Sequence, residues 1–180
     1  MLILASKSPR RRELMKFITD DFIVKTADVD ETLPENIAPA DAVLYLSKIK
    51  AQPFRNENDI VIGADTVVAI DGIILGKPAD ENDAKNMLKR LSNRVHSVFT
   101  GVTIIKGERE ESFFVETKVK FYNLSDEMIE SYIKTREPFD KAGAYGIQGY
   151  GCLLVESIEG DYFNVVGLPV SKLNQSLLNF

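Results

Sequence analysis

Three consecutive arginines, Arg10, Arg11 and Arg12, come directly after Ser8 and Pro9, close to the start of the chain. Ser is a favourable helix N-cap and Pro suits the first helical position, so the arginines are predicted in the first helical turn. Cations are unfavourable there, because the N-terminus of a helix carries partial positive charge. Exposed backbone N–H groups and guanidinium groups together bind phosphate, so the pattern predicts a phosphate-binding turn. Such arginines serve a ligand, and removing them should leave the unliganded fold no less stable; the alternative is a solvated basic helix end.

Two groups of carboxylates are candidates for metal binding or for activating water. Asp65 follows the apolar run Ile60–Ala64, and side chains at the carboxyl end of a buried strand often form functional sites. Thr66 adds a hydroxyl beside it. Glu31 lies in the acidic run 28–31, and together with Asp65 it would complete a Mg²⁺ site that also uses substrate phosphates. Taken singly, the alternatives are a turn-forming Asp65 and a solvated acidic loop.

Two further segments carry single polar side chains in loops that contain glycine. Gly76-Lys77-Pro78 places one lysine in a stiff loop, where it could neutralise a phosphate, although the glycine-rich run of a Walker motif is absent. Residues 137–149 contain three glycines within seven positions, which favours close approach of the backbone to a ligand. Gln148 has an amide that both donates and accepts, as recognition of a nucleobase edge requires. The alternative is a purely structural loop.

The composition favours a globular protein with a small anionic ligand. The 180 residues carry 22 basic and 27 acidic side chains, for a net charge of −5. Four of the basic residues lie between Lys7 and Arg12, so the positive charge is local, whereas nucleic-acid binding needs an extended basic face. One histidine, His96, and one cysteine, Cys152, exclude a His/Cys zinc site within one chain and an internal disulfide. A metal must then be a hard cation on carboxylates, such as Mg²⁺ or Mn²⁺.

The elements that must position these side chains alternate between strands and helices, with two hairpins. Asp71-Gly72 is typical of a tight hairpin turn, and the polar segment 106–111 predicts a second one. The pattern predicts an α/β fold with a mixed twisted sheet flanked by helices. The length suits a single domain of residues 1–180 or two lobes that share one sheet, and we assign residues 1–180 to a single domain. The predicted strands are 2–5, 22–27, 60–64, 66–70, 73–75, 95–105, 113–121 and 151–158. The predicted helices begin at Pro9 and Pro169 and span 39–55, 80–91 and 125–136.

Taken together, the motifs resemble those of the Maf family of nucleotide pyrophosphatases over nearly the whole chain. The matching segments are Leu4–Arg11, Asp30-Glu31, Lys50-Ala51, Gly63–Val68, Gly76–Pro78, Thr100–Val102, Glu137–Gly149 and Val165–Pro169. The resemblance implies a fold similar to that of inosine triphosphate pyrophosphatases, with two lobes and a central cleft. It also implies hydrolysis of nucleoside triphosphates to monophosphate and pyrophosphate with a divalent metal. Within the family, the Gly-Ile-Gln form of residues 146–148 goes with the branch that prefers dTTP and UTP, whereas a sister branch with an acidic residue nearby prefers a methylated guanine nucleotide.

The resemblance also implies roles for individual residues. Asp65 falls on the proton acceptor, and we assign catalysis to Asp65 and Lys77 and metal binding to Asp65 and Glu31. Whether Asp65 acts as a base, as a metal ligand or as both is open. Specificity positions fall on Arg10, Thr66 and Gln148. The full set of substrate contacts is assigned to Ser8, Arg10, Arg11, Lys50, Thr66 and Gln148.

Two other classes of function are open. A serine or cysteine hydrolase would need His96 as its base, because the chain has no other histidine. A non-catalytic nucleotide sensor or cell-division regulator would use the same phosphate-binding cleft, but it would gain nothing from Asp65 and Glu31 unless a metal were present.

The expected function is hydrolysis of dTTP and UTP, with modified pyrimidine nucleotides as further candidate substrates. The expected partner is a small nucleoside triphosphate, without nucleic acid or membrane, and a homodimer is plausible for this family. No apolar run reaches the length of a membrane span and no signal-peptide pattern opens the chain, so the cytoplasm is the expected location.

Overall fold

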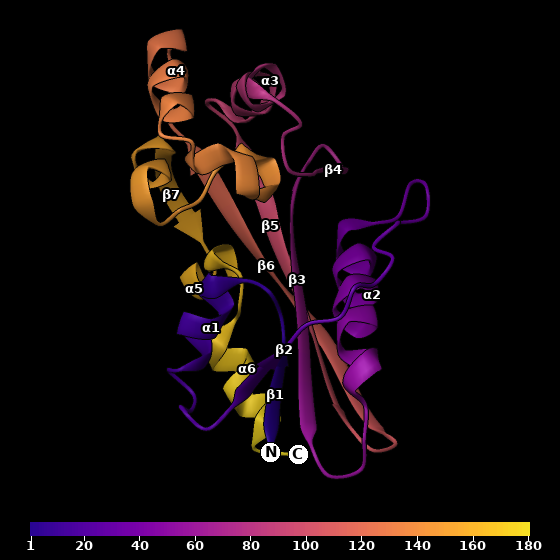
Figure 1. Ribbon diagram of the computed structural model, residues 1–180. Helices are drawn as coiled ribbons and strands as arrows, with labels where there is room; N and C mark the ends of the chain where they lie inside the picture. The colour runs from indigo at the N-terminus through magenta and orange to yellow at the C-terminus, as the bar shows by residue number, and fades with distance from the viewer. The chain divides into compact units, whose positions relative to one another are not determined.

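The computed structural model describes all 180 residues, Met1–Phe180, and contains one mixed seven-stranded sheet with helices along it (Figure 1). The strand order is β2-β1-β3-β5-β6-β7, and β4 pairs with β3 outside this path. β1 is parallel to β2 and β3, whereas the β3–β4 and β6–β7 pairs are antiparallel. The predicted α/β class with a mixed sheet is therefore confirmed.

The strands are β1 (Leu2–Ala5), β2 (Ile23–Lys25), β3 (Ile60–Ile70), β4 (Ile73–Leu75), β5 (Val95–Lys106), β6 (Arg109–Phe121) and β7 (Val155–Glu159). The α-helices are α1 (Pro9–Met15), α2 (Pro39–Ala51), α3 (Glu81–Leu91), α4 (Asp126–Lys134), α5 (Tyr162–Val166) and α6 (Val170–Leu177). Four short 3-10 helices are η1 (Gln52–Phe54), η2 (Glu137–Asp140), η3 (Ala142–Ala144) and η4 (Gly149–Leu154).

The chain divides into two compact units. Unit 1 comprises Met1–Thr66, Thr100–Val115 and Gly167–Phe180, and unit 2 comprises Val67–Phe99 and Glu116–Val166. The boundary between the units falls within strands β3, β5 and β6. The central cleft between two lobes stays a prediction.

In unit 1, helix α2 lies on one side of strands β1 and β3, and helices α1 and α6 lie on the other (Figure 1). Two glycines allow α2 to lie directly against the sheet. A Cβ at Gly63 would overlap the Ser47 carbonyl of α2 and lie 2.9 Å from the Ala51 nitrogen. A Cβ at Gly101 on β5 would likewise overlap backbone atoms of α2. Any larger residue at either position would push the helix away from the strands.

Unit 2 has its own apolar core, formed by side chains of the sheet, of helices α3 and α4 and of the segment after η2. Leu88 of α3, Ile129 of α4 and Phe121 of β6 are fully buried within it. Helix α3 begins at an Asp80 cap and α4 at a Ser125 cap, whose side chains accept from the backbone N–H three residues on. The capping and the amphipathic pattern explain why both helices were predicted correctly.

Several predicted bounds were wrong. The segments 60–64 and 66–70 form one continuous strand, β3. Its first part pairs with β1 and its last part pairs with β4, so the change of partner occurs without a break in the strand. Strand β6 begins at Arg109 and not at residue 113, and helix α5 was not predicted. The first part of the predicted strand 151–158 belongs to the 3-10 helix η4, and only its second part forms β7.

Candidate active site

The Asp65 cluster consists of Glu31, Lys50 and Asp65 in unit 1. The Lys50 ammonium forms an ion pair with the Asp65 carboxylate, and its Nζ lies 3.1 Å from Oε2 of Glu31. The side chains of Lys50 and Asp65 are only 18% and 13% exposed, whereas that of Glu31 is 54% exposed. The structure thus brings together three predicted site residues that lie far apart in the sequence.

Local packing explains the position of each member of the cluster. The parallel pairing of β1 and β3 ends at Ala5 and Gly63. Asp65 is two residues further along β3, and therefore lies just beyond the end of β1. Lys50 is in the last turn of α2, where a cation is favoured by the helix dipole. Since Gly63 lets α2 lie directly against β3, the lysine reaches Asp65 from the adjacent helix. Glu31 lies in the loop between β2 and α2.

The rest of the acidic run lies outside the cluster. Asp30 accepts a hydrogen bond from the N–H of Thr32 at 2.9 Å, which closes a local turn. Asp28 is 3.9 Å from Lys7, and both side chains are exposed. Only Glu31 of this acidic segment therefore takes part in the site.

The Arg11 network is a second group of contacts in unit 1 and comprises Ser6, Arg11, Thr66, Thr100 and Gly167. Arg11 donates from Nε to the Gly167 carbonyl at 2.8 Å and from Nη2 to the Thr66 hydroxyl at 3.0 Å. A longer contact of 3.5 Å joins its Nη1 to the Ser6 hydroxyl. The Thr66 hydroxyl also lies 2.8 Å from that of Thr100. Arg11 therefore links α1, β3 and the start of the C-terminal segment.

These contacts argue against the expectation that removing Arg11 leaves the unliganded fold no less stable. The helix-dipole argument considered only the local turn, whereas the guanidinium bonds to residues that are 55 and 156 positions away. Burial lowers the pKa of Arg11, the nearby Arg10 lowers it further, and Asp65 and Glu31 oppose both effects. The Asp65 cluster and the Arg11 network therefore share one electrostatic environment.

The start of α1 is as the sequence predicts. Ser8 caps the helix by accepting from the Arg11 N–H at 3.4 Å, and Pro9 is its first residue. The first turn contains no acidic residue. Arg10 is partly buried and Arg12 is exposed. The first turn is thus basic, as the sequence predicts, and Arg11 is engaged in the fold, whereas binding of an anion here stays a prediction.

The Asp65 cluster is compatible with a hard divalent cation. The carboxylates of Glu31 and Asp65 both contact the Lys50 ammonium, so two potential oxygen ligands lie around one cation. No group of three or more His, Cys, Asp and Glu side chains that could hold a metal occurs in the chain. Two carboxylates still suffice for Mg²⁺, which commonly takes its other ligands from substrate phosphates and water. The residues present therefore fit such an ion.

Lys77 and Gln148 both belong to unit 2. Lys77 is exposed in the loop between β4 and α3, and Gln148 is exposed immediately before η4. The N–H of Gly143 donates to the carbonyl of Gly76 at 3.0 Å, which joins the segments that carry the two side chains. Gly143 has a φ of +69°, and a Cβ there would lie 2.8 Å from a Val68 methyl group, so this approach requires glycine.

His96 is a core residue and not a catalytic base. It is 2% exposed, its Nε2 lies 2.7 Å from the Tyr145 hydroxyl, and its Nδ1 has no hydrogen-bond partner. Burial lowers its pKa to about 4, which keeps the ring neutral near pH 7. A serine or cysteine hydrolase needs a histidine that contacts the nucleophile and is oriented by a third group. The structure therefore disfavours that class.

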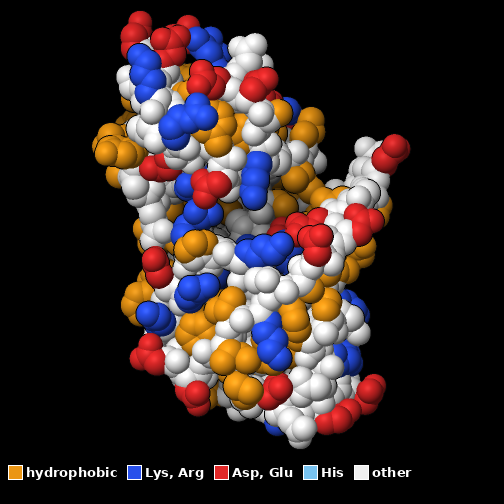
Figure 2. All heavy atoms as spheres, viewed as in Figure 1, with side chains coloured by type: hydrophobic (Ala, Val, Ile, Leu, Met, Phe, Trp, Pro, Cys, Tyr) orange, Lys and Arg blue, Asp and Glu red, His pale blue; other side chains and the backbone are white.

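The surface carries charges of both signs. On the face drawn in Figure 2, acidic and basic side chains are interspersed, and no continuous basic track crosses it. None of the helices combines the length and the apolar composition that a membrane span requires.

Sequence reasoning assigned no individual role to several residues that shape the site. Thr100 and Gly167 complete the Arg11 network, and Gly63 sets the approach of α2. All three lie within segments that carry the family resemblance, which was the one available signal. Glu137 is a fourth such residue.

Comparison with known proteins identifies the family. The model for Maf-like proteins matches residues 1–180. A dTTP/UTP pyrophosphatase of Carboxydothermus hydrogenoformans is 53% identical over 180 residues, covering 98% of this chain and 96% of the relative. Proteins of the same name from Clostridioides difficile and Bacillus cereus are 49% and 46% identical, covering 99% of this chain and 94% and 95% of the relatives. The solved structure of the Staphylococcus aureus Ham1 protein matches with a TM-score of 0.49 at 17% identity, over 83% of this chain and 77% of that chain. This chain belongs to the Maf-like protein family.

Proposed function

We propose that this protein is a nucleoside triphosphate pyrophosphatase that hydrolyses dTTP and UTP to the monophosphate and pyrophosphate. The names of the relatives described above support it, since they match this chain at 46% identity or more over nearly the full length of both partners. The observation that carries the proposal is the Asp65 cluster beside the Arg11 network. A carboxylate of low exposure surrounded by cations suits attack of water on a polyanionic phosphate chain.

Asp65 is the proposed proton acceptor. As the water oxygen bonds to the α-phosphorus, one of its protons passes to the Asp65 carboxylate. The bond from the α-phosphorus to the bridging oxygen breaks, and pyrophosphate leaves with that electron pair. Loss of a general base costs about 10²–10⁴-fold in rate, which sets the scale of the contribution of Asp65.

Membership of this family suggests dependence on a divalent metal in general. We propose Mg²⁺ or Mn²⁺ with Asp65 and Glu31 as its protein ligands. When bound, such an ion lowers the pKa of the attacking water and offsets phosphate charge. Lys50 already contacts both carboxylates, and we propose that its ammonium also contacts a phosphate when substrate is present.

The remaining assignments concern the phosphates and the base. Ser8, Arg10 and Arg11 are the proposed contacts of the phosphate chain, because a hydroxyl and guanidinium groups suit phosphate oxygens. Lys77 is proposed to stabilise the leaving pyrophosphate. Thr66, which Arg11 contacts directly, joins Arg10 as a proposed specificity residue.

Gln148 is the proposed determinant of base choice. Uracil and thymine present an N–H donor between two carbonyl acceptors, and a glutamine amide complements part of that pattern. Cytosine presents a ring nitrogen acceptor and an amino group at the same edge, so it leaves polar atoms unpaired at about 1–3 kcal/mol each. The order of kcat/KM should be dTTP and UTP first, CTP lower and purines poor.

We further propose that residues 1–180 act as one domain in the cytoplasm and that the protein can form a homodimer. The substrate is a free nucleotide, with no nucleic acid or membrane as partner. Modified pyrimidine nucleotides are included among the proposed substrates, since an amide at the pairing edge does not contact position 5 of the base.

The test is release of pyrophosphate by the purified protein with Mg²⁺ and each of dTTP, UTP, CTP, GTP and ATP. Turnover of dTTP and UTP that disappears when the metal is chelated is the expected result. Nucleotide binding without turnover of any of them would contradict the proposal and favour a nucleotide sensor.

A further inference from the structure

The side chain of Gln148 does not cap the helix that follows it. Gln148 occupies the N-cap position of η4, where a polar side chain normally accepts from the first unpaired N–H groups. Here the Tyr150 N–H donates instead to Oε2 of Glu137 at 2.9 Å, and the Gly151 N–H donates to Oε1 at 3.0 Å. A carboxylate from outside the helix therefore caps η4, and the Gln148 amide stays available for a ligand.

Glu137 is connected to the other side of Gln148 through Tyr132. The Tyr132 hydroxyl donates to Oε1 of Glu137 at 2.9 Å and accepts from the Gly146 N–H at 3.2 Å. Tyr132 is 4% exposed, and burial raises the pKa of its hydroxyl, so the proton that it donates is retained. The backbone is thus fixed both two residues before Gln148 and two residues after it.

The glycines of this segment fit closely around the same two side chains. Gly149 has a φ of +67°, and a Cβ there would contact Oε2 of Glu137 at 2.5 Å. A Cβ at Gly151 would overlap the Gly146 carbonyl and lie 2.9 Å from the Tyr132 hydroxyl. The backbone that carries Gln148 therefore approaches Glu137 and Tyr132 as closely as only glycine permits.

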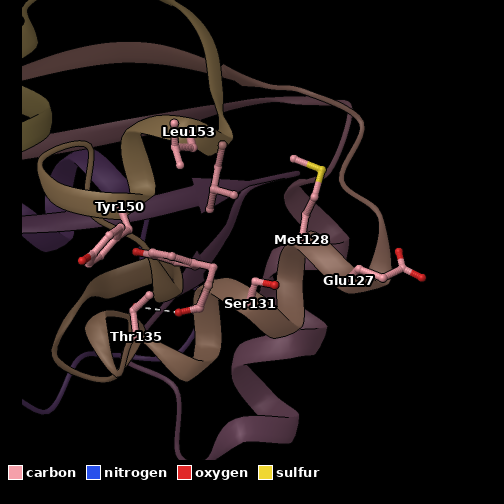
Figure 3. Close-up of a pocket in the computed structure, with 8 residues that line it drawn as sticks. Glu127, Met128, Ser131, Thr135, Tyr150 and Leu153 are labelled. Carbon is pink, nitrogen blue, oxygen red and sulfur yellow. Dashed lines mark hydrogen bonds between the residues drawn. The ribbon is translucent and has the colours of Figure 1, made fainter.

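Apolar burial fixes the end of η4 through Leu154, which is 3% exposed, but two earlier side chains of η4 lie largely outside the core. The side chains of Tyr150 and Leu153 are 64% and 68% exposed. A pocket lies between this part of η4 and helix α4, lined by Tyr150 and Leu153 on one side and by Met128, Ser131 and Thr135 on the other (Figure 3). The hydrogen bonds to the Glu137 carboxylate therefore constrain the residues that directly follow Gln148, together with the buried Leu154 at the end of η4.

We propose that Glu137 is a positioning residue for base recognition. By accepting from Tyr132, Tyr150 and Gly151, its carboxylate fixes the place and orientation of the Gln148 amide, and thereby the preference for uracil and thymine. This inference rests on the proposed function of Gln148.

The test compares kcat/KM for dTTP, UTP, CTP and GTP in wild type, Glu137→Ala, Glu137→Gln and Gln148→Ala. Glu137→Ala removes all three acceptor contacts, and a displacement of about 1 Å at a recognition group can cost 10²-fold. We expect the preference for UTP over CTP to fall about tenfold or more, mainly through KM for UTP. In Glu137→Gln the amide oxygen still accepts from Tyr132 and Gly151 and only the bond from Tyr150 is lost, so a smaller fall is expected.

The double variant Glu137→Ala/Gln148→Ala should have the same base preference as Gln148→Ala, because both changes act through one side chain. Glu130→Ala is the matched control. It removes an exposed carboxylate of α4 whose partner is Lys85, at 2.8 Å, and it should leave kcat/KM for all four nucleotides unchanged.

The outcomes separate this inference from the function assigned to Gln148. If Gln148→Ala abolishes the preference and Glu137→Ala lowers kcat/KM equally for all four nucleotides, Glu137 has a general structural role and the inference is wrong. If Gln148→Ala leaves the preference unchanged, the role of Gln148 and this inference fail together. Should Glu137→Ala not fold, Glu137→Gln decides, since an unchanged preference at an unchanged melting temperature would refute the inference.

Discussion

Replacing Arg11 by alanine should destabilise the protein even without nucleotide. Its guanidinium donates to the Gly167 carbonyl at 2.8 Å and to the Thr66 hydroxyl at 3.0 Å. Each of these hydrogen bonds to a charged group contributes about 1.5–3 kcal/mol to stability. Removing the cation from the positive end of the helix dipole returns only about 0.3–1 kcal/mol. Arg11 is only partly buried, so water replaces part of the loss. We therefore expect the free energy of unfolding to fall by about 2–3 kcal/mol.

The assay is thermal unfolding of the ligand-free protein, followed by circular dichroism. For a chain of this length, 1 kcal/mol corresponds to about 2–4 °C, so Arg11→Ala should lower the melting temperature by roughly 4–12 °C. Arg12→Ala is the matched control, because Arg12 belongs to the same helix but is exposed, and it should change the melting temperature little. Equal melting temperatures for the two variants would refute the structural role of Arg11.

Three further variants test other parts of the account. Gly63→Ala should push helix α2 away from β3 and lower the free energy of unfolding. Since Lys50 of α2 would then move away from Asp65, we also expect kcat to fall about tenfold or more. An unchanged kcat would contradict this prediction. The pKa of His96 is about 4 in the fold and about 6.5 when unfolded, so its contribution to stability is complete above pH 6.5 and decreases as the pH falls toward 4. Between pH 7 and pH 5, the free energy of unfolding measured with denaturant should fall by about 2 kcal/mol less in His96→Phe than in wild type. Parallel pH profiles of the two proteins would refute this role of His96. Gln148→Glu should abolish the preference for dTTP and UTP in kcat/KM comparisons, because a carboxylate cannot donate to a base carbonyl; an unchanged order of substrates would show that Gln148 does not contact the base.

Elements with strong local signals could be predicted from the sequence. Helices α3 and α4 have side-chain caps and an apolar face, and both were located to within two residues. The hairpin at Asp71-Gly72 has a turn sequence that fixes its position. Ser8 was correctly identified as the N-cap of α1.

Elements that depend on distant partners were not predictable. Residues 151–154 of the 3-10 helix η4 were predicted as part of a strand. The Tyr150 and Gly151 N–H groups of η4 are paired with Glu137, which is 13 and 14 residues away and could not be inferred from the local pattern. Strand β3 was divided in two because the sequence does not show that its partner changes from β1 to β4. In both cases the stabilising contact is tertiary and leaves no local pattern.

The same distinction applies to the site. Residue types and positions identified Glu31 and Asp65 as candidates, the family resemblance added Lys50, and the structure brings these three together. The structural contacts of Arg11 could not be foreseen, because the Gly167 carbonyl is a backbone group 156 residues away. Backbone acceptors carry no sequence signal, so a side chain that bonds to them can be mistaken for one reserved for a ligand.

The central claim is that Asp65 is essential for hydrolysis of a pyrimidine nucleoside triphosphate. The most direct measurement is kcat for pyrophosphate release from dTTP with Mg²⁺, in wild type, Asp65→Asn and the exposed control Asp28→Asn. The asparagine keeps the shape of the side chain but neither accepts a proton nor holds a metal well. We predict a fall of at least about 10²-fold in Asp65→Asn with an unchanged circular dichroism spectrum, and a rate near that of wild type in Asp28→Asn. A folded Asp65→Asn protein with a kcat close to that of wild type would contradict the account.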